Sequence, residues 1–386
     1  MINLAEELKR HGHEVQFFGM YDKQNTVGND WHISTSNLDF HTESKAERLK
    51  YAFSTIRSEE AYKKMRMLAN IYKPDIALLE NVNYQLTPSV IEALHEFEVP
   101  MIMTVHDFQL VCPNHMMYLP EEKKVCDRCL HGSYWNCAIH KCVHGSLFKS
   151  IGGSLESIYW HRKSAYKHVD LYICPSRFMQ SLIEPLPFVG DKAVYMQNFS
   201  NFTKAEKVSE KEDYLLYFGR ISEEKGIMEL LETVKALPEV QFHIAGDGPL
   251  SQIVKDAAEW YPNLEYFGYI SGDMLKSEIA HAKYGLYPSK WYENCPMSII
   301  EAMSLGTPMI TSASGGIPEL IQPGTGFIYG EPSEMAECIR KAMALPDEEY
   351  KAMAEKCLTI SFPSLEDYYN DLIVKIEEVI KNHVDE

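Results

Sequence analysis

Short apolar runs alternate with longer amphipathic segments throughout the second half of the chain. Each run is bounded by Gly, Pro or Asn, and we predict strands over 214–219, 241–245, 264–267, 284–288, 308–311 and 326–328. Between them, a 3.6-residue apolar periodicity predicts helices over 228–237, 250–260 and 297–305. Strands and helices that alternate at this spacing are typical of a parallel, doubly wound α/β sheet.

The first half repeats this alternation, with strands predicted over 14–19, 76–80, 101–106 and 171–174. A polar linker over 198–211 separates the two halves. Since single cores stop growing near 250–300 residues, a chain of 386 residues favours two domains. We therefore predict Rossmann-like domains over 1–197 and 198–364 that face each other across a cleft. The amphipathic helix over 365–386 is predicted to pack back on the first domain.

The start of the chain departs from the usual order of a doubly wound domain, which opens with a strand and a tight turn. Here helix signals begin at Asn3, with Leu4, Ala5 and Leu8 as the buried face. We therefore expect that the opening strand and its turn are missing. Either the chain is a truncated product or its start codon was assigned late.

Charge and hydropathy exclude several classes of partner. The formal net charge is −18, which argues against nucleic acid because phosphate binding relies on clustered Lys and Arg. Membrane contact is expected to be at most peripheral, and the basic stretch 161–168 is best interpreted as a solvated helix face. With no apolar run long enough to span a bilayer and no export signal, we expect a cytoplasmic protein.

Two cations follow the first strand of the second half. Arg220 and Lys225 lie between the strand that ends at Gly219 and the helix that begins after Gly226. Open α/β sheets bind ligands at the carboxyl ends of their strands, and two cations beside a helix N-terminus suit a pyrophosphate. Spacing alone is equally compatible with two solvated charges on a loop.

Two glutamates bracket the start of the helix predicted over 297–305. Glu293 lies on the preceding loop and Glu301 lies inside the helix, about two turns away. The two carboxylates could reach different parts of one elongated ligand. The backbone amides of Met297 and Ser298, which follow Pro296, could donate to phosphate or hydroxyl oxygens. Alternatively, this is a helix with an acidic N-terminal region and one exposed Glu.

Five motifs follow one another along the second half, namely Gly219-Arg220, Lys225-Gly226, the turn 246–249, the Glu293/Glu301 pair and the segment 314–319. In this order they resemble the retaining glycosyltransferases of family 4, which have the GT-B fold. The resemblance covers nearly the whole second half and, more loosely, the first.

The resemblance implies a role for each position. Arg220 and Lys225 would hold the donor diphosphate and stabilise the leaving group. Glu293 would contact hydroxyls of the donor sugar, and Glu301 the ribose. His106 matches the family's histidine beside the transferred sugar, although without the other motifs a structural role would be favoured. The donor-binding set also includes Gly219, Gly246, Pro296, Met297 and Ser298.

The resemblance further implies transfer from a nucleotide-diphosphate sugar to a glycan or lipid-linked acceptor, with retention of configuration. No side-chain nucleophile is evident, which is consistent with front-face attack. The sequence contains no Asp-x-Asp motif, and since Arg220, Lys225 and helix dipoles can supply the positive charge, catalysis is expected to need no divalent cation. In this chain 294–297 reads Asn-Cys-Pro-Met where the commoner family sequence is Gly-Phe-Gly-Leu, and the family's first glycine loop has no counterpart. The alternatives are a truncated, non-catalytic nucleotide-sugar-binding protein and a nucleotide-sugar epimerase on the same fold.

A cysteine-rich loop over 107–146 follows His106. Cys126 and Cys129 form a Cys-x2-Cys pair, and Cys137 and Cys142 follow. Four thiolates could bind a structural Zn²⁺ tetrahedrally, with Cys112 as an alternative ligand. Further alternatives to the four cysteines are His131, His140 and His144. Reduced thiols, disulfides and an iron–sulfur cluster remain open, and similar inserts occur in some bacterial members of the family.

Overall fold

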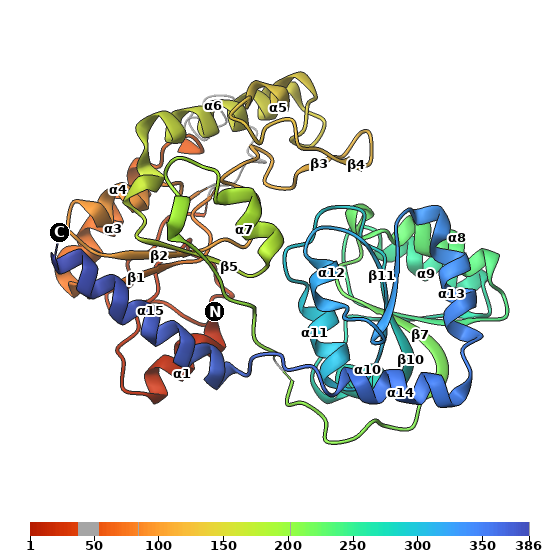
Figure 1. Cartoon of the computed structure of the whole chain (residues 1–386). Coiled ribbons are helices and arrows are strands. Elements are labelled where there is room, and N and C mark those ends of the chain that lie inside the picture. The colour runs from red at the N-terminus through yellow and green to blue at the C-terminus, as the bar shows by residue number, and fades with distance from the viewer. Residues whose placement is uncertain (38–53, 84, 201, 386) are drawn as a thin grey trace. The chain divides into compact units, whose positions relative to one another are not determined.

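The computed structural model describes residues 1–37, 54–83, 85–200 and 202–385 (Figure 1). The chain divides into two compact units. The first contains Met1–Glu122, Cys126–Met196 and Leu365–Glu386, and the second contains Lys123–Val125 and Gln197–Ser364. Among the described residues, no helix combines the length and apolarity that crossing a membrane would require.

The first unit is built on a parallel sheet in the order β1-β2-β5-β6. Its strands are β1 (Ala77–Leu79), β2 (Met101–Thr104), β5 (Leu171–Cys174) and β6 (Ala193–Tyr195). The helices of this unit include α1 (Ile2–Arg10), α3 (Glu59–Tyr72), α4 (Ser89–His95), α6 (Leu147–Lys163), α7 (Arg177–Ile183) and α15 (Leu365–Asp385). The cysteine-rich loop adds α5 (Trp135–Ile139), β3 (Tyr118–Leu119) and its partner β4 (Lys124–Val125).

The prediction of a strand over 14–19 is wrong. This segment is extended but half-buried, and it pairs with a neighbouring loop instead of joining the sheet. The Phe17 amide donates to the Gly28 carbonyl at 3.1 Å, and the Thr35 amide donates to the Gly19 carbonyl at 3.0 Å. Since its backbone groups are satisfied by residues 28–35, only an isolated bridge between Met20 and Thr35 forms there.

The C-terminal helix α15 packs against α1 and β2 within the first unit (Figure 1). The Tyr369 ring stacks on His11 with centroids 4.0 Å apart, and its hydroxyl lies 3.1 Å from Nε2 of His13. Near the other end of the helix, Nδ1 of His383 lies 3.3 Å from Oδ1 of Asp170. The last residues of the chain therefore complete the unit that the first residues begin.

The second unit contains a parallel sheet in the order β12-β11-β10-β7-β8-β9. Its strands are β7 (Glu212–Phe218), β8 (Gln241–Ala245), β9 (Leu264–Gly268), β10 (Ala282–Tyr287), β11 (Met309–Ser312) and β12 (Gly326–Tyr329). The helices are α8 (Ile227–Ala236), α9 (Ser251–Trp260), α10 (Gly272–His281), α11 (Met297–Ser304), α12 (Ile317–Leu320), α13 (Met335–Met343) and α14 (Asp347–Cys357).

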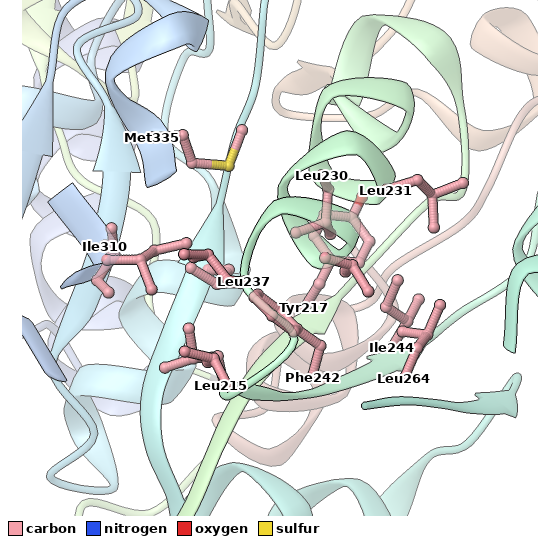
Figure 2. Packing of buried hydrophobic residues seen from close by; sticks show 14 of the residues in the cluster. Leu215, Tyr217, Leu230, Leu231, Leu237, Phe242, Ile244, Leu264, Ile310 and Met335 are labelled. Carbon is pink, nitrogen blue, oxygen red and sulfur yellow. The ribbon is translucent and has the colours of Figure 1, made fainter. Parts of the chain in front are cut away.

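Side chains of alternating direction bury both faces of the central strands β7 and β10, which explains why 214–218 and 284–287 are apolar runs. On one face, Leu215, Tyr217 and Phe242 pack with Leu230 of α8 and Met335 of α13 (Figure 2). On the other face the intervening strand residues pack against α11 and its neighbours. This rigid layer fixes the ends of the strands, from which the loops described next emerge.

Candidate functional site

The second sheet reverses its direction of growth between β7 and β10. From β7 the chain builds outward to β8 and β9, then returns to place β10 on the opposite side of β7. Ligands of open α/β sheets bind at the carboxyl ends of the strands at such a switch point. The loop after β7 carries Arg220 and Lys225, and the loop after β10 carries Glu293. The topology therefore brings together residues that are far apart in the sequence.

Lys225 and Glu293 form a buried ion pair at this point. The Lys225 ammonium lies 2.7 Å from Oε1 of Glu293, and the two side chains are only 16% and 8% exposed. The ammonium also donates to the Tyr287 hydroxyl at 3.1 Å. It lies over the rings of Tyr287 and Trp291, 5.4 Å and 5.0 Å from their centroids. The lysine is thus held between two aromatic faces, an arrangement that favours a cation.

One oxygen of Glu293 accepts three hydrogen bonds. Besides Lys225, the Ser289 hydroxyl and the Trp291 indole N–H each donate to Oε1 at 2.6 Å. Burial and the Glu293 carboxylate raise the pKa of Tyr287 well above its ordinary value, so that hydroxyl remains protonated. No sequence motif pointed to Ser289, Trp291 or Tyr287. The only signal for them was their position in and just after a strand that leads to Glu293.

Arg220 is oriented differently from Lys225. Its side chain is exposed, and it forms no ion pair with any residue that the structure describes. Its backbone carbonyl accepts a hydrogen bond from the Tyr217 hydroxyl at 2.6 Å, which fixes the start of the loop. The arginine is therefore held at its backbone while its guanidinium stays available to an anion.

Two glycines let the ends of β7 and β8 approach each other closely. The backbone of Gly246 has φ 143°, and a Cβ at this position would lie 1.9 Å from the Gly219 carbonyl oxygen. The Gly219 amide donates to the Ala245 carbonyl at 3.1 Å, and the Ile221 amide donates to the Asp247 carbonyl at 2.9 Å. The loops 219–226 and 246–250 are joined by backbone contacts that a larger residue would disrupt.

Gly226 ends this loop and caps helix α8. Its φ of 76° lies in the left-handed region, and a Cβ there would lie 2.0 Å from the Pro288 carbonyl oxygen. Lys225 is consequently the last residue before the helix N-terminus. The glycine thus allows the loop after β7 to approach the end of β10.

The helix that carries the second glutamate begins directly beside this site. Pro296 is the N-cap of α11, so Met297 and Ser298 form its first turn, and Ser298 donates from its hydroxyl to the Phe218 carbonyl at 3.2 Å. Glu301 lies in the same helix and is half-buried. The amides of the first turn of α11 open toward the end of β7, where anions are favoured by the helix dipole.

The segment 314–319 holds the backbone of Glu293. The Gly316 amide donates to the Glu293 carbonyl at 2.7 Å, and Gly315 pairs with Glu293 as an isolated parallel bridge. A Cβ on Gly315, whose φ is 62°, would lie 2.3 Å from the Glu293 carbonyl oxygen. This contact explains why a glycine occupies position 315.

In the first unit, His106 lies two residues beyond β2, because the strand ends at Thr104 and not at the histidine. Its Nε2 contacts Oε2 of Glu80, which follows the neighbouring strand β1. Asp107 accepts from the Asn83 side-chain amide at 3.0 Å and from the Gln109 backbone amide at 2.9 Å. A pocket at the carboxyl ends of β1 and β2 is lined by Glu80, His106, Asp107 and Gln109, among others. Glu80 was not recognised from the sequence.

The five cysteines of the loop 107–146 lie around one pocket, but the structure does not support the predicted zinc site. The pocket is lined by Cys112, Cys126, Cys129, Cys137 and Cys142. Within the described ranges, no three or more His, Cys, Asp or Glu side chains are grouped to hold a metal ion. All nine cysteines are free thiols.

Burial explains the state of these thiols. It raises the pKa of Cys112 to about 11 and that of Cys129 to about 12, which favours the protonated thiol. A hydrogen bond between Cys137 and Cys142 raises the pKa of the first and lowers that of the second. Cys137 and Cys142 pack with Leu119 in a small apolar cluster. Of the alternatives from the sequence, packed reduced thiols agree with this arrangement.

Comparison with known proteins identifies the second unit. Residues 198–357 match the family described as "Glycosyl transferases group 1". A lipopolysaccharide 1,2-N-acetylglucosaminetransferase of Salmonella typhimurium is 28% identical over 239 residues, which cover 55% of this chain and 62% of that enzyme. The chain spans less than two thirds of the length of the curated relatives that it matches first.

Solved structures agree on the architecture of the whole chain. Sucrose-phosphate synthase from Thermosynechococcus elongatus aligns with a TM-score of 0.69 and 15% identity, covering 98% of this chain and 92% of its own. HepE of Anabaena, in complex with UDP and glucose, aligns with a TM-score of 0.61 and 15% identity, covering 97% and 94%. The predicted GT-B fold is confirmed, and the chain is a relative of the GT-B glycosyltransferases.

Proposed function

Because residues 198–357 match the glycosyl transferases group 1 family, we propose that this chain transfers a sugar from a nucleotide-diphosphate donor to a glycan or lipid-linked acceptor. The observation that carries the proposal is the buried Lys225–Glu293 pair at the switch point between β7 and β10. The pair provides a cation for the diphosphate and a carboxylate for sugar hydroxyls at adjacent positions.

In the proposed reaction, Arg220 and Lys225 bind the donor diphosphate and stabilise the negative charge that develops as the glycosidic bond breaks. The amides of Met297 and Ser298 add donors at the N-terminus of α11, and Glu301 contacts the ribose. These groups supply the positive charge that a metal ion supplies in other transferases, so the reaction needs no divalent cation. Gly219, Gly246 and Pro296 shape the backbone around the diphosphate.

We further propose that the reaction retains the anomeric configuration. The acceptor attacks from the face on which the diphosphate leaves, and a donor phosphate oxygen accepts the acceptor's proton. In this proposal Glu293 and His106 are the side chains that contact the transferred sugar. No side-chain nucleophile is required by this route.

The comparisons favour a UDP-sugar as the first donor to test. HepE of Anabaena was solved with UDP and glucose, and the Salmonella typhimurium relative is a lipopolysaccharide N-acetylglucosaminetransferase. These names support a role in polysaccharide or glycolipid synthesis. They were assigned to those proteins, and for this chain they direct the choice of probes.

Isothermal titration calorimetry with UDP, GDP, ADP and dTDP, in EDTA, tests the donor site. Arg220→Ala and Lys225→Ala should each weaken binding of the preferred diphosphate by about tenfold to a hundredfold, because a hydrogen bond to a charged group contributes about 1.5–3 kcal/mol. The matched control is Lys235→Ala, an exposed lysine in the last turn of α8, which should leave the affinity unchanged.

Two results would contradict the proposal. Unchanged affinity in both Arg220→Ala and Lys225→Ala would show that the diphosphate binds elsewhere. If a nucleotide binds as expected, the matching nucleotide sugars are then incubated with the chain and release of the diphosphate is measured. Binding without any turnover, across a panel of glycan and lipid-linked acceptors, would favour the non-catalytic binding protein.

A further inference from the structure

Helix α6 of the first unit buries three serines together with Trp160, whereas the two large apolar residues of its first turn are exposed. Ser150, Ser154 and Ser157 are buried, with exposed fractions of 0%, 0% and 3%. In the first turn of the same helix, Leu147 is 51% exposed and Phe148 is 67% exposed. This orientation is the reverse of what the hydrophobic effect alone would select.

The buried serines have specific partners that hold the helix in this orientation. The Ser150 hydroxyl accepts from the Val143 amide at 2.9 Å, and the Ser154 hydroxyl donates to the Tyr134 carbonyl at 2.9 Å. Rotating the helix to bury Leu147 and Phe148 would break these hydrogen bonds and expose the serines. The apolar residues therefore remain on the surface in the folded chain.

Helix α5 packs against α6 (Figure 1). It likewise buries small residues and exposes large apolar ones. Its buried residues are the small Cys137 and Ala138. Trp135 and Ile139, one helical turn apart on a common face, are 51% and 70% exposed. Two adjoining helices thus both present large apolar side chains to the solvent, and such patches mark sites of interaction.

The charge around these helices differs from that of the rest of the chain. Residues 128–155 contain no Asp or Glu, whereas the whole chain has 55 in 386 residues, which would give about four in a segment of this length. The same segment carries Arg128, Lys141 and Lys149, and the two lysines are exposed. The carboxylate of Glu122 lies 4.0 Å from Arg128 and 3.9 Å from His140, so the exposed Lys141 and Lys149 are the charges that this segment presents to the solvent.

We propose that the α5–α6 face, defined by Trp135, Ile139, Lys141, Leu147, Phe148 and Lys149, docks on a lipid bilayer that contains anionic lipids. Exposed aromatic and aliphatic side chains insert into the headgroup region, and Trp is favoured at this interface because its ring is amphipathic. Lys141 and Lys149 attract anionic headgroups. Docking needs no catalytic turnover, so it stands apart from the proposed function.

Sedimentation with sucrose-loaded vesicles tests this surface. The full chain should bind vesicles of seven parts phosphatidylcholine and three parts phosphatidylglycerol and should bind pure phosphatidylcholine weakly. The double variant Ile139→Asp/Phe148→Asp should lower the partition coefficient at least tenfold, because it replaces two inserting side chains with anions. Lys141→Glu/Lys149→Glu should lower binding to the anionic vesicles by about fivefold or more for each lysine, and only at low salt.

The matched control places the same type of change on exposed apolar residues of the second unit. Ile253→Asp/Trp260→Asp on α9 alters side chains that are 43% and 82% exposed and should leave vesicle binding unchanged. Circular dichroism melting checks that each variant is folded. Absence of wild-type binding to anionic vesicles, or an equal loss in the control, overturns the proposal. A concentration-dependent dimer that Ile139→Asp/Phe148→Asp abolishes, without vesicle binding, would assign the face to a second copy.

Discussion

Glu293→Gln tests whether the carboxylate restrains the lysine that is proposed to bind the diphosphate. Glutamine has the shape of glutamate and can still accept hydrogen bonds from Ser289 and Trp291 through its oxygen. The substitution therefore removes mainly the charge that faces the Lys225 ammonium at 2.7 Å. In the variant without a ligand, the largely buried Lys225 ammonium lies between the rings of Tyr287 and Trp291 and has lost the carboxylate that faced it.

The cost to the folded state follows from this geometry. Hydrogen bonds to charged groups contribute about 1.5–3 kcal/mol, and the retained acceptors limit the loss to about 2 kcal/mol of unfolding free energy. For a domain of 150–250 residues this corresponds to a fall in the melting temperature of about 4–8 °C. The same change should tighten UDP binding about tenfold, or about 1.4 kcal/mol, because the diphosphate no longer competes with a carboxylate for Lys225.

UDP-glucose separates the two roles of the glutamate. Its diphosphate gains the same advantage in Glu293→Gln, but its sugar loses a carboxylate partner, so its affinity should improve less than that of UDP. Calorimetry with both ligands measures the two constants, and Glu229→Gln is the matched control because Glu229 pairs with Lys290 in the same unit. If Glu293→Gln weakens UDP binding or leaves it unchanged, Lys225 is not restrained by this carboxylate.

Two further substitutions probe the fold of the second unit and its surroundings. Gly246→Ala should lower the unfolding free energy by at least about 3 kcal/mol in urea denaturation, since its Cβ would lie 1.9 Å from the Gly219 carbonyl oxygen. The control is Gly152→Ala on α6, where nothing lies within 4 Å of the added Cβ and the unfolding free energy should rise by about 0.5–1 kcal/mol. Equal changes in unfolding free energy for the two variants would refute the packing argument. Burial lowers the pKa of Lys211 from 10.5 to about 7, so the folded state disfavours its charged form, and the destabilising contribution of Lys211 should diminish as the pH increases from 7 to 10.5. Lys211→Met removes this penalty. The difference in melting temperature between the variant and the wild type should therefore be largest near pH 7 and should decrease towards pH 10. A difference in melting temperature that does not change with pH would show that Lys211 is not buried in this way.

The strands and helices of the second half were predictable because each one is specified by its own residues. The apolar runs at 241–245 and 264–267 agree with β8 and β9 to within one residue at each end. The central strands β7 and β10 are buried on both faces, so 214–218 and 284–287 are apolar runs. The order of the glycine, lysine and glutamate motifs likewise indicated the GT-B family before any contact was known.

Pairing and side-chain convergence were decided only by the tertiary structure. The segment 14–19 has a strand-like composition, but its hydrogen bonds go to residues 28–35, and composition does not specify a partner. The spacing of Cys126, Cys129, Cys137 and Cys142 is compatible with zinc binding, yet spacing does not show whether side chains are placed to hold a metal. The hydrogen bonds of Trp291 and Ser289 to Glu293, and its pairing with Lys225, likewise appear only once β7 and β10 lie side by side.

Helix α6 shows the limit of periodicity most directly. A reading of its apolar positions alone would bury Leu147 and Phe148, but the folded unit buries Ser150 and Ser154. Hydrogen bonds from the Val143 amide and to the Tyr134 carbonyl fix that choice, and these partners come from a loop whose path the sequence does not specify. A sequence determines which segments can form elements, whereas the free energy of contacts between distant segments determines which face each element buries.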